Sequence, residues 1–537
     1  MNTNMKKAAV IVLGSALLSS VVAGCGSDDK KNGETASPGA STAASAAPSG
    51  PPVTLTVEVF DRGVQGQPDL NNNTWTRYVN EKFGKPNNAI VKFVPVPRSQ
   101  EVEKLNVMMA AGEAPDISFT YDGTTVTRYA RSDGLYVLDE LLEKHGKQLK
   151  AYLGEEVLAY GKSDGKQISI PAKRTLVAWN GLFIRKDWLD KLGMPVPTNR
   201  DELYNTLVAF RDKNPGNVKG VVPWVTGSIG MNYSFGNLTD SFLAPMSEEE
   251  FATTPKWLKP GYKDGLKWIN KLYNEKLISP DFALDKTLKQ ADADVTTGKA
   301  GFFGANWDYL LTQKIRDGLK QNAPDANFVP VDTFKNAEGK YPKVVYDANG
   351  VFSFIPKTSK NAELAVKYLN WMADPEVLFF LQYGQEGVNH KMVNGIPQGI
   401  QQTGDNMQMS NLNLDYTLVV NGAEMGDLEK NIKAYAAALS GGDSSYEKLA
   451  VDSYKINTTD GYVNFYYGIP NEANLKLGRT VGDLDKQMME RLIVCKPAEF
   501  DALYDSLVKE YMNAGGKAIQ EENIKNYRAV IASRQKK

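Results

Sequence analysis

Cysteine and histidine, which carry much of the nucleophilic and metal chemistry of proteins, are nearly absent from this chain. Its 537 residues include two cysteines, Cys25 and Cys495, and two histidines, His145 and His390. A histidine-based zinc site or a Ser-His-Asp triad needs such side chains together, and the two histidines lie far apart in the sequence. The sequence therefore predicts no metal, no cofactor and no histidine-dependent catalysis.

The first cysteine stands in a pattern typical of lipid attachment. Lys6 and Lys7 precede an apolar run, residues 8–22, whose length and flanks are typical of a secretion signal rather than a membrane span. The run leads into Val-Ala-Gly-Cys25, which resembles the lipobox of bacterial lipoproteins; the alternative is a buried cysteine at the end of a hydrophobic helix. We expect residues 1–24 to be a signal peptide and Cys25 to carry S-diacylglycerol and N-acyl groups. Such lipid would anchor the protein at the extracellular face of the cell membrane of a Gram-positive bacterium.

The segment that follows the anchor differs in composition from the rest of the chain. Residues 25–52 are rich in Ser, Ala, Gly, Pro and Thr and are expected to form a flexible tether. The remaining chain is longer than one typical hydrophobic core, so we expect two lobes. Its formal net charge is −1 with both signs mixed, which argues against nucleic acid or an anionic lipid surface as partner. Membrane contact is therefore expected through the lipid anchor alone.

The chain after the tether begins with alternating strand and helix patterns. Runs rich in β-branched and aromatic residues predict strands at 53–59, 90–94 and 116–121. Apolar residues at helical spacing predict helices at 75–83 and 102–109. A β-α-β-α-β order implies a parallel sheet with helices on its faces, and ligands of such sheets bind beyond the carboxyl ends of the strands.

Helical patterns dominate the later chain. Residues 198–201 are typical of a capping box ahead of a helix over 203–210, and Asp374-Pro375 predicts the start of another helix. Cys495 follows apolar residues at helical spacing and is expected to be a small core residue. Four tryptophans at apolar helical spacings are also assigned to the core: Trp188, Trp257, Trp268 and Trp371.

Four stretches, in order along the chain, share motifs with one family. They are residues 105–117, ending in Ala-Pro-Asp-Ile; 165–171 followed by 182–193; 298–307, Gly-Lys-Ala-Gly-Phe-Phe-Gly-Ala-Asn-Trp; and 361–376. Together they resemble the extracellular solute-binding lipoproteins of family 1, which feed carbohydrate ABC importers. The large branch with alginate- and oligosaccharide-binding members is the most similar.

This resemblance implies a fold and an activity. The fold would be a two-lobed α/β, periplasmic-binding-protein-like (type II) fold with hinge crossovers and a central ligand cleft that closes on its ligand. The first α/β lobe would comprise 53–168 plus 348–388, and the second, mainly helical α/β lobe 169–347 plus 389–537. The resemblance further implies a monomeric, non-catalytic protein that delivers a carbohydrate ligand to the permease subunits of an ABC transporter.

Some members of that branch hold calcium in a loop that follows the helix equivalent to 203–210. Here residues 210–220 lack the alternating oxygen ligands and the closing acid that a Ca²⁺ ion needs. We therefore expect Asp212 and Asn214 to be turn residues and predict no metal.

The ligand residues are inferred from the chemistry of sugar recognition. Pyranose C–H faces stack on aromatic rings, while the hydroxyl groups need donors and acceptors on planar polar side chains. Two pairs fit best: Tyr121-Asp122 at the end of a predicted strand, and Trp307-Asp308, where the family often places a sugar-stacking ring. The alternative role for Trp307 is core packing. Weaker candidates are Arg174, Trp179, Trp224, Tyr346 with Asp347, Tyr383 with Glu386, and Tyr466 with Tyr467.

Other functions and ligands stay open at this point. A surface-anchored glycosidase or polysaccharide lyase needs only two carboxylates, and 63 acidic residues leave room for one, although no catalytic signature is recognisable. A sugar-sensing co-receptor for a sensor kinase would share the same cleft. A neutral oligosaccharide is the first expectation for the ligand. An acidic sugar would call for more basic residues beside Arg174, and a peptide or another organic solute is a further alternative.

Overall fold

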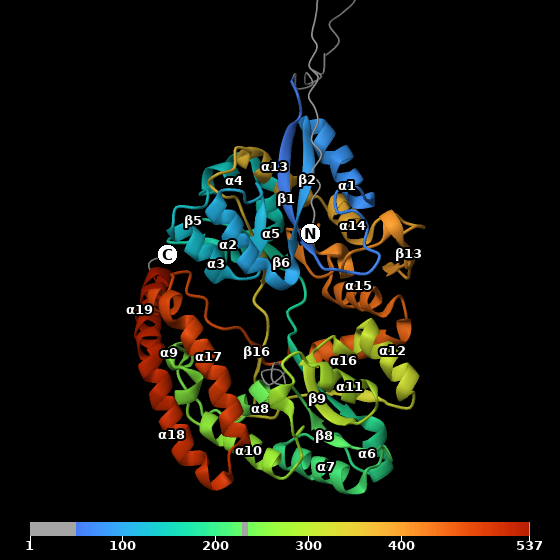
Figure 1. Cartoon of the computed structure of the whole chain (residues 1–537), viewed down its shortest axis with the longest axis vertical. Helices are drawn as coiled ribbons and strands as arrows, with labels where there is room; N and C mark the ends of the chain where they lie inside the picture. The colour runs from blue at the N-terminus through green and yellow to red at the C-terminus, as the bar shows by residue number, and fades with distance from the viewer. Residues whose placement is uncertain (1–49, 228–234, 536–537) are drawn as a thin grey trace, which may run out of the picture. The chain divides into compact units, whose positions relative to one another are not determined.

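Two large hydrophobic cores, each built around its own four-stranded sheet, organise the part of the chain that the structure describes (Figure 1). The structure is a computed structural model and describes residues 50–227 and 235–535. Cys25, the predicted signal peptide and nearly all of the predicted tether lie outside the described residues.

The first lobe, as we call the elements around the first core, opens with the predicted β-α-β-α-β pattern. β1 and β2 pair in parallel from Val53 opposite Ala89 to Asp61 opposite Pro97, and a parallel bridge joins Val57 of β1 to Ile117 ahead of β3. This part of the prediction is confirmed. Its elements are β1 (Val53–Asp61), α1 (Thr74–Val79), β2 (Ala89–Pro97), α2 (Glu101–Ala111), β3 (Ser118–Thr120), α3 (Gly123–Arg131), α4 (Asp139–His145), α5 (Lys147–Ala159), β4 (Lys162–Ser163), β5 (Lys166–Gln167) and β6 (Ile170–Arg174).

The chain then builds the second lobe, the elements around the second core. Its sheet has the order β10-β7-β9-β8, in which β7 pairs antiparallel with β9 and β10, and β8 pairs parallel with β9. The elements are β7 (Asn180–Arg185), α6 (Lys186–Leu192), α7 (Arg200–Lys213), β8 (Val222–Val225), α8 (Asn237–Asp240), α9 (Glu248–Thr253), α10 (Tyr262–Asn274), α11 (Lys289–Thr296), β9 (Ala300–Asn306), α12 (Gln313–Asn322), β10 (Phe328–Val331) and β11 (Lys343–Val344).

After β11 the chain returns to the first lobe and later contributes again to the second. The first sheet has the order β15-β6-β12-β3. The next elements along the chain are β12 (Asn349–Phe354), α13 (Ala362–Met372), α14 (Pro375–Tyr383), β13 (His390–Val393), β14 (Ile396–Gly399), β15 (Val420–Asn421) and α15 (Leu428–Ser440), of which β12, α13, α14 and β15 supply side chains to the first core. The last elements are α16 (Glu447–Ile456), β16 (Gly461–Tyr462), α17 (Glu472–Val494), α18 (Phe500–Tyr511) and α19 (Lys517–Gln535).

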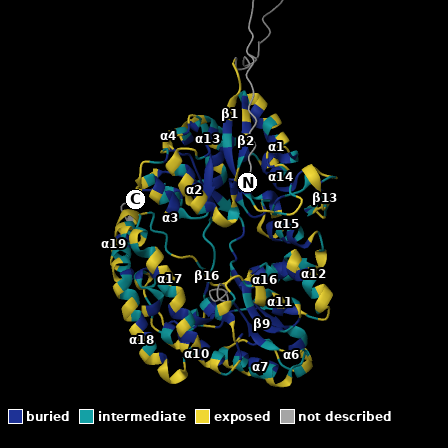
Figure 2. Cartoon of the chain, in the orientation of Figure 1, coloured by how far each residue is buried: buried dark blue, intermediate teal, exposed yellow. Residues whose placement is uncertain are grey.

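Burial follows the lobes. In Figure 2 most of β1 and β9 is dark blue, whereas β2 alternates buried with exposed residues and the outer faces of the helices carry yellow, exposed ones. Met488 and Leu492 of α17 and Leu507 of α18 belong to the second core, so the C-terminal helices are part of that lobe. The lobe boundaries stay a prediction, and packing adds one observation to them: the first core includes Met409, Tyr416, Leu418, Val419 and Val420.

Asp116 shows what the Ala-Pro-Asp motif does in the fold. Its carboxylate accepts hydrogen bonds from the backbone N–H and hydroxyl of Thr56, both at 2.8 Å, and from the hydroxyl of Ser359 at 2.6 Å. A carboxylate that accepts several short hydrogen bonds ties its donors firmly together. The motif therefore joins β1 to the segment ahead of α13.

Two local details of helix ends differ from or refine the sequence predictions. Asp374 caps α14 with Pro375 at the first helical position, as predicted. The N-cap of α7 is Asn199 rather than Thr198, because the Asn199 side chain accepts from Glu202 N while the Glu202 carboxylate accepts from Thr198. At the other end of α7, Asn214 adopts the left-handed conformation of a C-cap, whereas Asp212 lies in the last helical turn.

The core assignments are largely as predicted. Trp188 and Trp257 are buried, while Trp268 and Trp371 are partly buried and pack against the cores. Cys495 is partly buried against the second core. No helix within the described residues combines the length and apolar character that a membrane crossing requires. In residues 50–227 and 235–535, no three His, Cys, Asp or Glu side chains gather as a metal site would need, and the absence of a metal stays a prediction.

Candidate functional site

Two segments that connect the lobes lie side by side. Residues 175–179 lead from β6 to β7, and residues 345–348 lead from β11 back to β12. The backbone N–H of Tyr346 donates to the carbonyl of Val177 at 2.8 Å, and that of Arg174 donates to the carbonyl of Ala348 at 2.8 Å. We call this pair of segments the crossovers.

An aromatic stack with a cation sits on the crossovers. The rings of Trp179 and Tyr346 are stacked, with centroids 5.1 Å apart and planes 28° from parallel. The guanidinium carbon of Arg174 lies 4.1 Å from the centre of the Tyr346 ring. Stacking and cation–π contact hold flat groups in place at little entropic cost. The structure thus brings together Arg174, Trp179 and Tyr346, which the sequence indicated as separate candidates for ligand binding.

Hydrogen bonds extend this stack into the first lobe. Arg174 donates from Nε to the carbonyl of Asn349 at 3.0 Å and from Nη1 to Oδ1 of Asn421 at 2.9 Å. The Nδ2 group of Asn421 donates to the hydroxyl of Tyr121 at 3.1 Å. Burial raises the pKa of Tyr121, with Arg174 lowering it in part, so its phenol stays protonated near neutral pH. Tyr121 is therefore part of the same network as Arg174.

The second lobe contributes Trp307 and Asp308, at the end of β9. Trp307 is 5% exposed, stacked on Tyr435 with centroids 5.6 Å apart and edge-on to Tyr454 at 5.3 Å. Its backbone N–H donates to the carbonyl of Trp179 at 2.8 Å. Trp307 therefore links the site to the core and leaves little ring surface for a ligand.

Asp308 is held by a residue of α15. Tyr435 donates its hydroxyl hydrogen to Oδ2 of Asp308 at 2.8 Å. Burial raises the pKa of Asp308, and the hydrogen bond from Tyr435 opposes this shift. Because α15 packs against the β13–β14 hairpin whereas Asp308 follows β9, this bond connects elements that lie far apart in the sequence.

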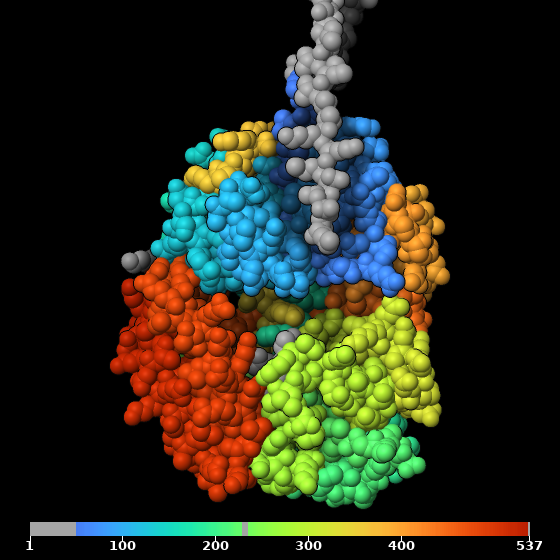
Figure 3. Space-filling model, viewed as in Figure 1, coloured from blue at the N-terminus to red at the C-terminus, as the bar shows by residue number. Residues whose placement is uncertain are grey.

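A cavity of about 390 Å³ adjoins the network. Its wall combines rings with polar groups, including Tyr121, Tyr160, Asp347, Asn349 and Tyr466. The hydroxyl of Tyr466 donates to the carbonyls of Ala159 and Tyr160, so the segment before α17 closes against the first lobe. Figure 3 shows this face hollowed between the first lobe and the second. Burial raises the pKa of Asp347, while Arg174 lowers it.

Two of the predicted ligand residues lie in other surroundings. Trp224 is 0% exposed in the second core, edge-on to Phe235 and Phe302, so its ring is enclosed by core side chains. Asp122 caps α3, accepting from Thr124 N at 2.9 Å and from the Thr125 hydroxyl at 2.6 Å. Neither placement supports contact with a ligand, and the binding roles of the predicted residues stay predictions.

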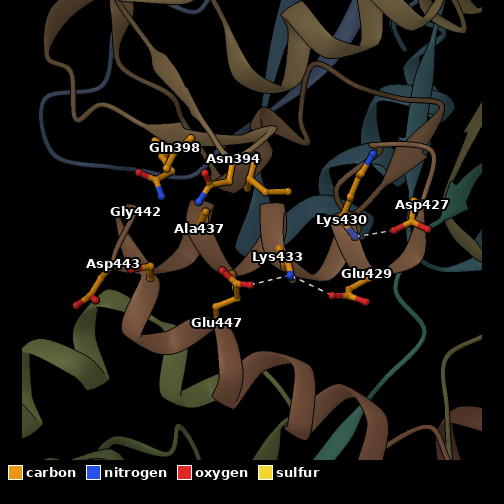
Figure 4. Close-up of a pocket in the computed structure, with 14 residues that line it drawn as sticks. Asn394, Gln398, Asp427, Glu429, Lys430, Lys433, Ala437, Gly442, Asp443 and Glu447 are labelled. Atoms are coloured by element: carbon orange, nitrogen blue, oxygen red, sulfur yellow. Dashed lines mark hydrogen bonds and ion pairs between the residues drawn. The ribbon is translucent and has the colours of Figure 1, made fainter.

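A second cavity, of about 500 Å³, lies between the β13–β14 hairpin and α15 (Figure 4). Lys433 lies between Glu429 and Glu447, at 3.0 and 2.9 Å, so these charges are already paired. Its lining residues include no aromatic side chain. We place the candidate site at the crossovers, because stacked rings and polar groups converge there, where the two lobes connect, in the way sugar recognition requires.

Tyr435, Asn421 and Asn349 were not identified from the sequence. Tyr435 lies in an alanine-rich amphipathic helix, and Asn421 and Asn349 belong to short strands. Their neighbours in sequence carry no motif, and their importance comes from contacts across large sequence separations, such as 247 residues between Arg174 and Asn421.

Comparison with known sequences gives a family match. The family model described as bacterial extracellular solute-binding protein matches residues 68–378, more than half of the chain. Lipoprotein LipO of Bacillus subtilis (strain 168) is 28% identical over 57% of this chain, and the match spans 62% of LipO. The polygalacturonan/rhamnogalacturonan-binding protein YtcQ of the same organism is 23% identical over 82% of this chain and 86% of YtcQ.

Solved structures share the fold. Alginate-binding protein AlgQ2, solved without calcium ion, matches with a TM-score of 0.62 and 18% identity over 89% of this chain and 98% of AlgQ2. FusA of S. pneumoniae in complex with kestose matches with a TM-score of 0.62 and 17% identity over 89% of this chain and 100% of FusA. At these identities the likeness shows the fold alone, and the predicted fold class is confirmed.

Proposed function

We propose that this chain, which belongs to the bacterial extracellular solute-binding proteins, captures a carbohydrate at the crossovers and delivers it to an ABC importer. One observation carries the proposal: Trp179, Tyr346 and Tyr121 lie with Arg174 and Asn421 where the two lobes connect. Rings for C–H faces and planar groups for hydroxyls are what a sugar site needs.

The relatives support a carbohydrate but differ in its kind. YtcQ is named for binding polygalacturonan and rhamnogalacturonan, AlgQ2 for alginate, and FusA was solved with kestose. An oligosaccharide is therefore the proposed ligand class.

Capture is proposed to occur by closure of the lobes. A ligand that contacts Tyr121 of the first proposed lobe and the Asp308–Tyr435 pair of the second would favour the closed state, because it gains contacts there that the open state lacks. The closed form would then be recognised by the permease subunits. The proposed lobes are 53–168 plus 348–388 and 169–347 plus 389–537, with the packing of 409–420 favouring the first lobe for that segment.

Attachment through Cys25 is proposed as part of the mechanism. The lipobox-like motif and the lipoprotein relative LipO support it. Lipid would confine the protein to the surface where its permease lies, which raises their effective concentration. Replacing Cys25 by Ala should move the protein from the membrane fraction into the medium, and an unchanged membrane fraction would contradict the anchor.

Titration calorimetry with an oligosaccharide panel tests the binding function. A ligand that binds the folded state should also raise the melting temperature by mass action. Mass spectrometry of the sugar after long incubation distinguishes transport from catalysis: an unchanged sugar is expected, whereas released products would favour a glycosidase or lyase. Binding by no member of the panel would contradict the proposal.

A further inference from the structure

We propose that the site selects acidic saccharides and that Arg174 binds a uronic-acid carboxylate of the ligand. This inference rests on the proposed function, and it departs from the neutral oligosaccharide expected from the sequence. It concerns which sugar is bound and leaves the transport role unchanged.

Three neighbouring residues hold the Arg174 side chain. Its Nε and Nη1 groups donate to Asn349 and Asn421, and its flat face lies 4.1 Å from the Tyr346 ring centre. These contacts from three neighbours fix the plane of the guanidinium. A guanidinium whose orientation is already fixed loses less conformational entropy when it binds a planar group such as a carboxylate.

The hydrogen-bond acceptors of Arg174 carry no charge. Both are neutral groups, and no carboxylate within the described residues lies within ion-pair distance of the Arg174 guanidinium. Two other arginines of this region differ: Arg62 is paired with Asp415 at 2.6 Å and Arg98 with Glu101 at 2.5 Å. Arg174 therefore has no carboxylate in direct ion-pair contact, although Asp347 acts on its charge from a longer distance.

Arg174 has more N–H donors than its two hydrogen-bond acceptors use. A guanidinium has five N–H groups, and the hydrogen bonds to Asn349 and Asn421 use two of those on Arg174. Arg174 is partly exposed, and its remaining donors are assigned to the ligand. Arg316 provides the contrast, since it also lacks a carboxylate partner but is buried away from the crossovers with two carbonyls as acceptors. Exposure beside Tyr121 and Tyr346 is what distinguishes Arg174.

A sugar carboxylate matches these features better than a hydroxyl group does. A bidentate carboxylate uses two parallel N–H donors and neutralises the charge, and such charge-assisted bonds are about twice as strong as neutral ones. A hydroxyl would accept one bond and leave the charge partly desolvated without a counterion. Burial already lowers the pKa of Arg174, the direction expected for a cation that lacks a close anion.

The test compares acids with their own methyl esters. Oligogalacturonates and oligomannuronates of two to four units, each beside its fully methyl-esterified form, are titrated into the protein by calorimetry. The protein should bind one acid series at least about tenfold more tightly than the esters, and Arg174→Gln should reduce affinity for the acids about 10- to 100-fold. Arg174→Lys keeps the positive charge but loses the paired N–H donors of the guanidinium. Its affinity for the acids should lie between those of the native protein and Arg174→Gln.

The matched control is Lys173→Gln, the neighbouring position on β6, whose side chain pairs with Glu424 at 3.3 Å. It removes one positive charge nearby and should keep the preference for acids. Unchanged melting temperatures verify folding of each variant, and Tyr346→Phe provides a second probe that leaves the charge in place.

The outcomes separate the inference from the function beneath it. Equal affinity for acids and esters, or a preference that survives Arg174→Gln, overturns the role of Arg174. Binding of neutral oligosaccharides such as kestose without binding of the acids overturns the inference while leaving carbohydrate capture intact. Binding of no saccharide at all overturns both.

Discussion

Trp307→Ala distinguishes a supporting role of this ring from direct contact with a ligand. The ring is 5% exposed and packs between Tyr435 and Tyr454, so its removal should leave a cavity. Large-to-small changes of buried aromatic residues cost about 3–5 kcal/mol of unfolding free energy. Trp307→Phe keeps an aromatic ring at this position and should cost less than about 1.5 kcal/mol.

The same loss can be stated as a melting temperature. The compact unit from Pro48 to Lys537 has about 490 residues, and unfolding entropy near 2.1 cal/mol/K per residue gives about 1 kcal/mol/K in total. The variant should therefore melt about 3–5 °C lower if the unit unfolds as a whole. Urea unfolding followed by circular dichroism measures the free energy directly.

Trp179→Ala is the matched comparison. Its ring is partly exposed and stacks on Tyr346, so the change should cost less stability and more ligand affinity than Trp307→Ala. An Ala variant of Trp307 with unchanged stability would refute the supporting role. It would restore the sequence-based interpretation of this ring as a stacking surface if affinity fell at the same time.

Three further predictions follow from single side chains. Glu58 is 0% exposed and burial raises its pKa well above 4.5, so its contribution to stability is complete below the unfolded pKa and lost as pH rises through the folded pKa. Glu58→Gln should therefore be more stable than the native protein at pH 8, and the difference in unfolding free energy, measured in urea, should narrow towards pH 4.5. An equal difference at both pH values would contradict this. Asp116→Ala removes the acceptor shared by Thr56 and Ser359 and should lower the free energy of unfolding, measured in urea, by at least about 3 kcal/mol. A loss below about 1 kcal/mol would argue against the role given to the Ala-Pro-Asp motif. Trp224→Phe should lower the melting temperature yet leave ligand affinity within about twofold, since the ring is enclosed by the second core. A tenfold loss of affinity in the calorimetric titration would instead place Trp224 in the binding site.

The fold was more predictable than the site, and particular residues show why. Residues 53–121 alternate β-branched runs with helical patterns, and local periodicity is enough to give strand and helix order there. The cap at Asp374 was found because Asp-Pro is a local signal, whereas the cap of α7 was placed one residue early because Thr198 and Asn199 both have capping side chains.

The site depends on contacts that no local pattern encodes. Tyr346 and Trp179 were offered as weak candidates, and only the pairing of the two crossovers brings their rings together. Asn421 and Tyr435 reach the site from segments far along the chain, through bonds to Arg174 and Asp308. Family resemblance gave the type of protein, and tertiary structure was required to identify the side chains.

The most direct test of a carbohydrate site at the crossovers is a crystal structure of the protein with the tightest-binding oligosaccharide of the panel. The sugar should lie against Tyr121, Arg174 and Tyr346, with at least one ring of the ligand stacked on an aromatic side chain of the crossovers. Sugar bound instead in the cavity between the β13–β14 hairpin and α15, with the crossovers empty, would contradict the proposed site.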